Sequence, residues 1–154
     1  MPADMTNGLD PFNLERFVEA QRRTFEAACQ ELAIGAKSSH WMWFVFPQLA
    51  GLGRSETSKF FALGSLEEAH AYLAHPVLGP RLRRAAALVL AVEGRSIAEI
   101  MGTPDDMKLR SSMTLFALAS EDRSVFVQVL ERYFAGKLDP STLRLLGLSG
   151  GDES

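Results

Sequence analysis

The sequence lacks several features that define common classes of protein. It has one cysteine, Cys29, in 154 residues, so it cannot form an internal disulfide, and a reducing cytoplasm is the expected location. Its longest apolar runs, residues 41–46 and 85–92, are far shorter than the about 20 residues that a membrane-spanning helix needs. No basic segment followed by an apolar one begins the sequence, so we expect no secretory signal.

Charge of neither sign dominates, and metal ligands are sparse. The 16 basic and 19 acidic residues give a net charge of −3, which gives no reason to expect a nucleic-acid or membrane-surface partner. The three histidines and Cys29 show neither Cys-x-x-Cys nor His-x-x-x-His spacing, so we expect no metal and no cofactor. The Gly-x-Ser-x-Gly motif of many serine hydrolases is also missing.

What is present fits a soluble globular domain. Hydrophobic residues make up 47% and charged residues 23% of the sequence, close to the average for such domains, and the length suits one domain. We therefore expect a single domain over residues 1–154. Within it, Pro, Gly, Asn and Asp without periodicity indicate a loose N-terminal arm over residues 1–12, and the sequence SGGDES indicates a flexible tail over residues 149–154.

Apolar residues at helical spacing predict a chain made of helices. The pattern predicts one long helix over residues 14–34, with Asn13 as its N-cap and Gly35 as its C-terminal stop. The helix from Arg81 to Glu93 is apolar on most sides, so we expect it at the centre of the fold. Capping signals predict further helices over residues 66–74, 97–101, 107–119, 122–135 and 140–146.

The aromatic run at residues 41–46 has no helical stripe. Its composition would suit a buried strand, but no second strand candidate exists to pair with it, and an unpaired buried backbone is costly. We predict a short helical turn or an irregular buried segment that ends at Pro47. The expected fold is all-α, a single multihelical domain of about seven to eight helices.

Five segments carry a resemblance to a known family. These are LERFVEAQ (14–21), SHWMWFVFPQL (39–49) with GLGRS (51–55), HPVLGPRL (75–82) and DDMKLRSSMTLF (105–116). Together they resemble the bacterial domain-of-unknown-function 1810 family, sometimes labelled calpastatin-like, over nearly all of residues 14–146. The resemblance implies a multihelical fold and brings no established activity or catalytic residue. The calpastatin label carries little weight, because calpastatin inhibitory regions resemble disordered repeats and this sequence has no repeat.

The segment from His40 to Gln48 is the first candidate for a binding site. Tryptophan and histidine each bring a polar atom that needs a partner when buried. One interpretation is a pocket wall, in which Trp41 or Trp43 stacks on a flat ligand and His40 or Gln48 hydrogen-bonds to it. The other interpretation is an aromatic core segment whose polar atoms bond to the backbone. The sequence leaves both open.

Two stretches without acidic residues supply the second candidate. One carries Arg54 in a glycine-rich turn, and the other carries Lys108 and Arg110 on a helix that is apolar on more than one side. Buried cations must be paired, so they either meet an anionic ligand or are neutralised internally, for example by Asp105 or Asp106.

The two candidates combine into one functional hypothesis. We expect a pocket for a small anionic, nucleotide-like ligand, with hydrolysis as the reaction considered and His40 as the candidate general base, since histidine is the side chain that titrates near neutral pH. The helix with Arg110-x-x-Met113 is also loosely similar to ADP-ribose-processing N-glycosidases, without their catalytic carboxylate. The alternative is a non-catalytic interaction or regulatory module. The predicted ligand-binding residues are His40, Trp41, Trp43, Gln48, Arg54, Lys108 and Arg110.

Overall fold

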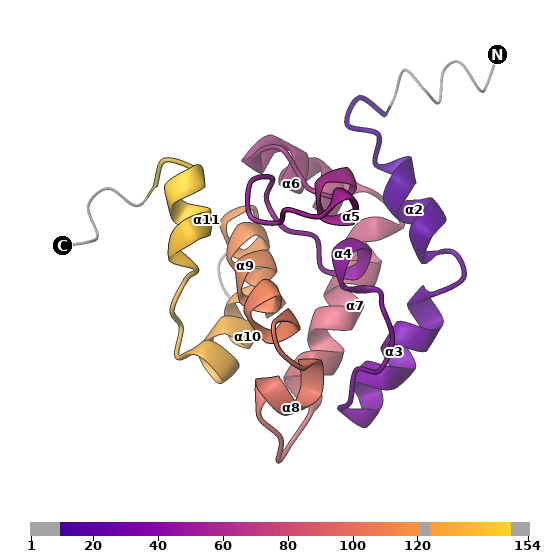
Figure 1. Cartoon of the computed structure of the whole chain (residues 1–154), viewed down its shortest axis with the longest axis vertical. Helices are drawn as coiled ribbons and strands as arrows, with labels where there is room; N and C mark the ends of the chain where they lie inside the picture. The colour runs from indigo at the N-terminus through magenta and orange to yellow at the C-terminus, as the bar shows by residue number, and fades with distance from the viewer. Residues whose placement is uncertain (1–9, 121–123, 149–154) are drawn as a thin grey trace.

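The computed structural model of the protein is all-helical over residues 10–120 and 124–148, the residues that the structure describes (Figure 1). No named strand occurs in these residues; Leu49 and Leu63 form an isolated β-bridge. The all-α prediction is confirmed, but the predicted count of seven to eight helices is wrong, because the described residues form ten. These are α2 (Glu15–Gln21), α3 (Phe25–Ile34), α4 (Met42–Val45), α5 (Glu56–Phe60), α6 (Leu66–Ala74), α7 (Leu78–Ala91), α8 (Ile97–Met101), α9 (Asp105–Leu118), α10 (Val125–Phe134) and α11 (Pro140–Leu145).

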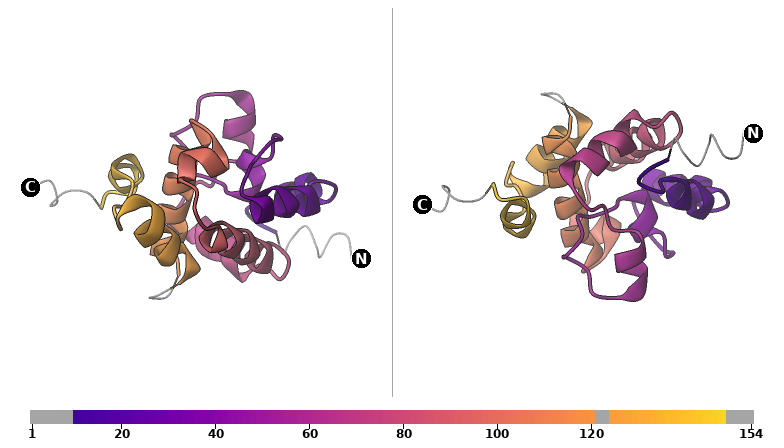
Figure 2. Two further views of the ribbon diagram at one scale, coloured as in Figure 1. Left: turned by 90° about the horizontal axis from the view of Figure 1, so that it is seen from below. Right: turned by 90° about the horizontal axis from the view of Figure 1, so that it is seen from above.

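Helices α7 and α9 together occupy the centre of the fold. Helix α7 packs against α3, α6 and α10, whereas α9 packs against α6, α8, α10 and α11 (Figures 1 and 2). The predicted central helix, Arg81 to Glu93, corresponds to α7 and buries Leu82 and Val89, but its Arg83 and Ala87 are exposed. Helix α9 is more enclosed, with every residue from 111 to 116 buried. The centre is therefore shared, because the arginines of α7 keep one of its faces in solvent.

The predicted long helix over residues 14–34 is wrong, because the chain turns between α2 and α3. The hydroxyl of Thr24 donates to the Ala20 carbonyl at 2.7 Å, a local bond of the kind that competes with the regular helical pattern. Asn13 is not the N-cap either; it has a positive φ of 53°. The carboxylate of Asp10 caps α2 instead, accepting from the backbone N–H of Leu14 at 2.7 Å.

Arg16 connects α2 to the segment before α6. Its guanidinium donates to the carbonyls of Phe12, Phe60 and Ala62 at 2.7–2.9 Å. It also forms an ion pair with Glu68 at 3.3 Å, where both side chains are mostly buried. These bonds to an uncharged backbone and one carboxylate satisfy the cation internally, so Arg16 is a structural residue.

Several predicted helix starts are confirmed. The Ser65 hydroxyl caps α6, Ser96 and Glu99 form a reciprocal capping box at α8, and Asp139 caps α11 ahead of Pro140. Each cap satisfies a backbone N–H that lacks a partner within its helix. Local sequence was sufficient at these points because the capping side chain and its backbone partner are three residues apart.

Two other helix starts differ from the prediction. Helix α9 begins at Asp105, two residues before the predicted start at Met107, and Pro104 lies at its capping position. Helix α10 begins at Val125, where the Ser124 hydroxyl accepts from the Val127 N–H at 3.3 Å. The predicted start at Asp122 lies outside the described residues. So do the predicted tail and most of the predicted arm, although residues 10–12 form the turn that leads into α2.

Candidate functional site

Trp41 is a core residue held by Glu31. Its side chain is 1% exposed, and its indole Nε1 donates to Glu31 Oε1 at 2.8 Å. The same carboxylate accepts from the backbone N–H groups of Ser38 and Ser39 and from the Ser39 hydroxyl. For Trp41 the structure thus matches the core-segment interpretation, with a carboxylate as the partner of the indole in place of backbone.

The hydrogen bonds at Glu31 stabilise its charged form. Partial burial acts to raise the pKa of this carboxyl, but the hydrogen bonds from Ser39, Ser38 and Trp41 outweigh it and lower the pKa from 4.5 to about 2. A carboxyl whose pKa is lower in the folded state stabilises the fold above its unfolded pKa. This contribution is lost as the pH falls from about 4.5 to about 2.

We expect Glu31→Gln to destabilise the protein at pH 7 by about 2 kcal/mol, because hydrogen bonds to a charged group are exchanged for weaker ones and the amide turns a donor toward other donors. The difference from the wild type should shrink as the pH falls below about 4.5 and be smaller at pH 3 than at pH 7, since the carboxyl protonates in the unfolded state first and in the folded state only near pH 2. Urea unfolding followed by circular dichroism at both pH values measures this. Glu19→Gln is the control, because Glu19 lies in an exposed ion pair with Arg22 and its loss should be too small to measure.

Lys37 and Asp105 join this segment to α9. The Lys37 ammonium lies 2.8 Å from Asp105 Oδ2, donates to the Ser39 carbonyl at 2.7 Å, and sits 4.8 Å from the centre of a Trp41 ring. Asp105 is also 3.9 Å from the Lys108 ammonium. The Asp105 carboxylate is thus shared by two lysines, and it lies much closer to the Lys37 ammonium than to that of Lys108. Lys108 is left only partly neutralised.

A concavity of about 190 Å³ lies beside the first turns of α9, next to α11 and the loop after α4. We call it the Lys108 concavity. It brings together one residue from each of the two predicted segments, Gln48 and Lys108. Other lining residues are Leu52, Pro104, Met107, Ser111, Asp139 and Ser141.

The polar groups that line the Lys108 concavity differ in how many hydrogen bonds they already make within the protein. Asp139 Oδ2 accepts from the Ser111 hydroxyl at 3.1 Å and from both the N–H and the hydroxyl of Thr142. The Ser141 hydroxyl accepts from the Arg144 guanidinium at 3.0 Å, which leaves its proton available to donate. The Lys108 side chain is 29% exposed, and the Gln48 amide makes no hydrogen bond to any residue that the structure describes. The groups with the fewest partners within the protein are therefore the Lys108 ammonium and the Gln48 side-chain amide.

The other predicted site residues lie elsewhere. His40 is exposed and does not line the Lys108 concavity. Trp43 is half-buried beside a neighbouring cavity of about 10 Å³, too small for anything but about one water. Arg110 donates to the carbonyls of Lys137 and Leu138 at 3.0 and 2.8 Å, which fixes the connection between α10 and α11.

Arg54 lies in the glycine-rich turn 51–55, and the glycine there has a packing role. A Cβ added to Gly53 would lie 2.4 Å from the Cβ of Ser58, so only glycine allows this close approach. The Ser55 hydroxyl then caps α5 by accepting from the Ser58 N–H at 3.0 Å. Arg54 itself is exposed and forms no ion pair with a described residue.

Asp139 and Ser141 were missed by the sequence analysis. Asp139-Pro140 was recognised as a helix start, but nothing local indicates that α11 packs against α9. The bond between Ser111 and Asp139 spans 28 residues of sequence. Its only sequence signal is the buried hydroxyl in an apolar helix, which needs a partner from somewhere.

Fold and site together define a small all-α domain with a polar concavity beside its most buried helix. Within residues 10–120 and 124–148 no three metal-ligating side chains gather, and no helix is long and apolar enough to span a membrane. The chain belongs to the family described as "Protein of unknown function (DUF1810)", whose model matches residues 11–146. The resemblance noted in the sequence is thus confirmed.

One solved structure is similar over almost its whole length. It is the conserved hypothetical protein Rv1873 from Mycobacterium tuberculosis, with 53% sequence identity and a TM-score of 0.88, over 90% of this chain and 99% of that chain. No protein of curated function matches. Neither the family nor this neighbour has an assigned activity, so the function is open.

Proposed function

We propose that this protein binds a small anionic ligand in the Lys108 concavity. The observation that carries the proposal is the convergence of the Lys108 ammonium and the Gln48 amide, each incompletely bonded, on one concave surface. An ammonium and an amide N–H are donors that suit phosphate or carboxylate oxygens. The single buried thiol, Cys29, supports a cytoplasmic location as part of this proposal.

The size and charge of the concavity narrow the ligand class. Its volume of about 190 Å³ is below the about 300 Å³ at which typical small-molecule sites begin, so only part of a ligand is enclosed. One lysine and one hydrogen-bonded aspartate favour a single anionic group over a polyphosphate. Leu52 and Met107 add apolar surface for a ring. A nucleoside monophosphate, with its phosphate at Lys108 and its base over Met107, combines these properties.

The proposal is for binding and includes no reaction. His40, the predicted general base, does not line the concavity. The Ser111 hydroxyl donates to Asp139 Oδ2, and the same oxygen also accepts from the N–H and the hydroxyl of Thr142 at the start of α11, so this pair has a structural role.

An NMR titration tests the proposal. Adenosine monophosphate and inorganic phosphate are added separately to the ¹⁵N-labelled protein, and we expect saturable shifts of the Gln48, Lys108 and Ser141 signals. Lys108→Gln should weaken binding at least about tenfold, which is about 1.4 kcal/mol. Lys59→Gln removes the same charge from exposed α5 and should leave the affinity unchanged. The absence of any saturable shift at millimolar probe would reject the proposal.

A second candidate function is protein binding at the same face. Met107 and Leu145 are 47% and 50% exposed, and Leu145 packs beside Gly51 next to the concavity. Exposed apolar side chains grouped on one face mark interaction sites. In this case the same spectra would show no response to the small probes, but the backbone N–H signals of Met107 and Leu145 would shift as the protein is concentrated and copies associate.

A further inference from the structure

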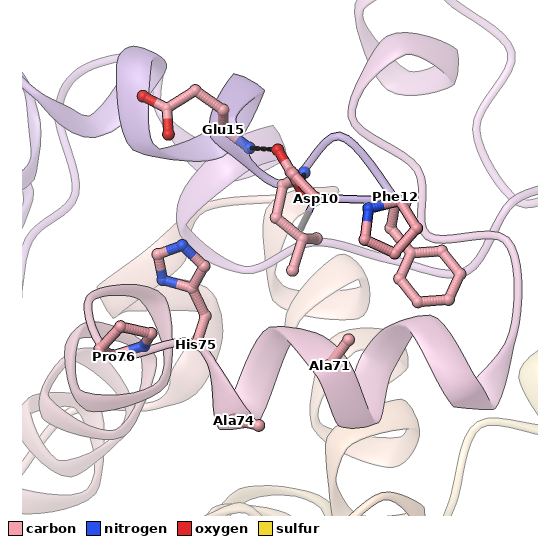
Figure 3. Close-up of a pocket in the computed structure, with 9 residues that line it drawn as sticks. Asp10, Phe12, Glu15, Ala71, Ala74, His75 and Pro76 are labelled. Carbon is pink, nitrogen blue, oxygen red and sulfur yellow. Dashed lines mark hydrogen bonds between the residues drawn. The ribbon is translucent and has the colours of Figure 1, made fainter. Parts of the chain in front are cut away.

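A hollow of about 400 Å³ lies between the segment before α2 and the end of α6, apart from the Lys108 concavity (Figure 3). Its volume falls within the range of about 300–1,000 Å³ that is usual for small-molecule sites. The surface is mostly apolar, with Phe12 on one side and Ala71 and Ala74 of α6 on the other, and Leu14 also lines it. None of these residues belongs to the site proposed above.

Hydrogen bonds hold the first wall in place without filling the hollow. The Asp10 carboxylate accepts from the backbone N–H groups of Leu14 at 2.7 Å and Glu15 at 3.1 Å, and Figure 3 shows the latter bond. Arg16 donates to the carbonyl of Phe12 at 2.7 Å. Since these bonds fix the backbone of residues 12–15, the wall is preformed, which lowers the cost of ordering it around a ligand.

The opposite wall is open because its side chains are small. Ala71 and Ala74 project only a methyl group each from the α6 surface across from Asp10 and Phe12 (Figure 3). A leucine at either position would occupy space within the hollow. This provides a way to close the site without touching the core, because Ala74 is exposed.

His75 gives the hollow one oriented hydrogen-bond donor. Its Nδ1 accepts from the backbone N–H groups of Val77 at 3.1 Å and Leu78 at 3.2 Å, at the start of α7. An accepting Nδ1 places the proton of the neutral ring on Nε2. This Nε2–H has no acceptor among the residues that the structure describes, and the ring lies at the edge of the hollow.

The charges beside the hollow select against anions. Asp10 and Glu15 both line it, and among the residues that the structure describes no lysine or arginine does. We propose that this hollow is a second binding site, for an uncharged apolar small molecule whose carbonyl or other neutral acceptor takes the hydrogen bond of His75 Nε2–H. Its ligand class is thus opposite in charge preference to that of the Lys108 concavity.

Two probes of matched shape test the proposal, benzamide and benzoate. Benzamide offers a neutral carbonyl acceptor and should shift the His75 ring signals and the Ala71 and Ala74 methyl signals saturably, with a Kd in the millimolar range expected for a fragment. Benzoate should bind this hollow at least fivefold more weakly, because its charge meets Asp10 and Glu15. Its effects on Lys108 signals report the other site separately, so failure of one proposal leaves the other measurable.

A filling variant provides the decisive comparison. Ala74→Leu should weaken benzamide binding at least tenfold while the circular dichroism spectrum stays that of the wild type. Ala87→Leu, the same change at an exposed position of α7, should leave it unaltered. Benzamide shifts that do not saturate, that survive Ala74→Leu, or that benzoate reproduces at equal affinity would each overturn the proposal.

Discussion

Replacing Val89 with aspartate is expected to remove most of the free energy that stabilises the fold. Val89 is 0% exposed, on the face of α7 that packs into the core. A carboxylate there would lie among the buried apolar residues of the core, so it must either stay charged in an apolar site or remain protonated at pH 7, which costs about 4–7 kcal/mol for a pKa raised by 3–5 units. Loss of the buried valine adds to this. The total is comparable with the about 5–15 kcal/mol by which proteins of this kind are stable.

The pH dependence separates this cause from a simple packing defect. A carboxyl whose pKa is raised in the folded state destabilises the fold increasingly as the pH rises above its unfolded pKa, so Val89→Asp should be less unstable at pH 4 than at pH 7, relative to the wild type. Val89→Thr, which keeps the shape without the charge, should show no such trend. Ala87→Asp, on the exposed face of the same helix, should unfold close to the wild-type urea concentration. A small, pH-independent loss at Val89 would contradict its place in the core.

The features that could be predicted from the sequence are helix ends that depend on residues within one helical turn of each other. Ser96 and Glu99 satisfy each other's backbone groups across three residues, and Gly35 ends α3 with a φ of 86°. The division of the first helix could not be predicted in this way. The apolar stripe continues through it, and only the Thr24 hydroxyl, which bonds to Ala20, marks the turn. The extra short helix α5 is capped by the Ser55 hydroxyl and follows a turn in which a Cβ on Gly53 would lie 2.4 Å from the Ser58 Cβ.

The candidate site depended on contacts that are distant in sequence. Residue type correctly indicated that Trp41 and the cations need partners, but not which ones. Glu31 binds Trp41 from the preceding helix, and the carbonyls that Arg110 binds lie 27 and 28 residues away. Residue type shows that a buried polar group needs a hydrogen-bond partner. Which residue becomes that partner depends on how the helices pack, and this cannot be read from the local sequence. Of the predicted site residues, Gln48 and Lys108 are the two that line the Lys108 concavity.

Replacing Gly79 with alanine is expected to destabilise the protein by several kcal/mol, although alanine is the better helix former by about 1 kcal/mol. Gly79 lies in the first turn of α7, within the segment HPVLGPRL, and is buried. A Cβ at this position would lie 2.1 Å from the carbonyl oxygen of Leu73 and 3.0 Å from its carbonyl carbon. These are backbone atoms near the end of α6, so relief requires α6 and α7 to move apart, and a core packed this closely resists such movement.

The measurement is the urea midpoint by circular dichroism, and Gly64→Ala is the matched control. Gly64 is exposed and has no positive φ, and an added methyl there meets a side-chain atom, Glu68 Oε1 at 3.2 Å, and no backbone atom, so we expect a change within about 1 kcal/mol. Because helix propensity alone predicts that Gly79→Ala raises the midpoint, the two explanations differ in sign. A raised or unchanged midpoint would mean that the corner between α6 and α7 can relax. A large loss at Gly79, with little at Gly64, would identify the contact with Leu73 as the reason for glycine at this position.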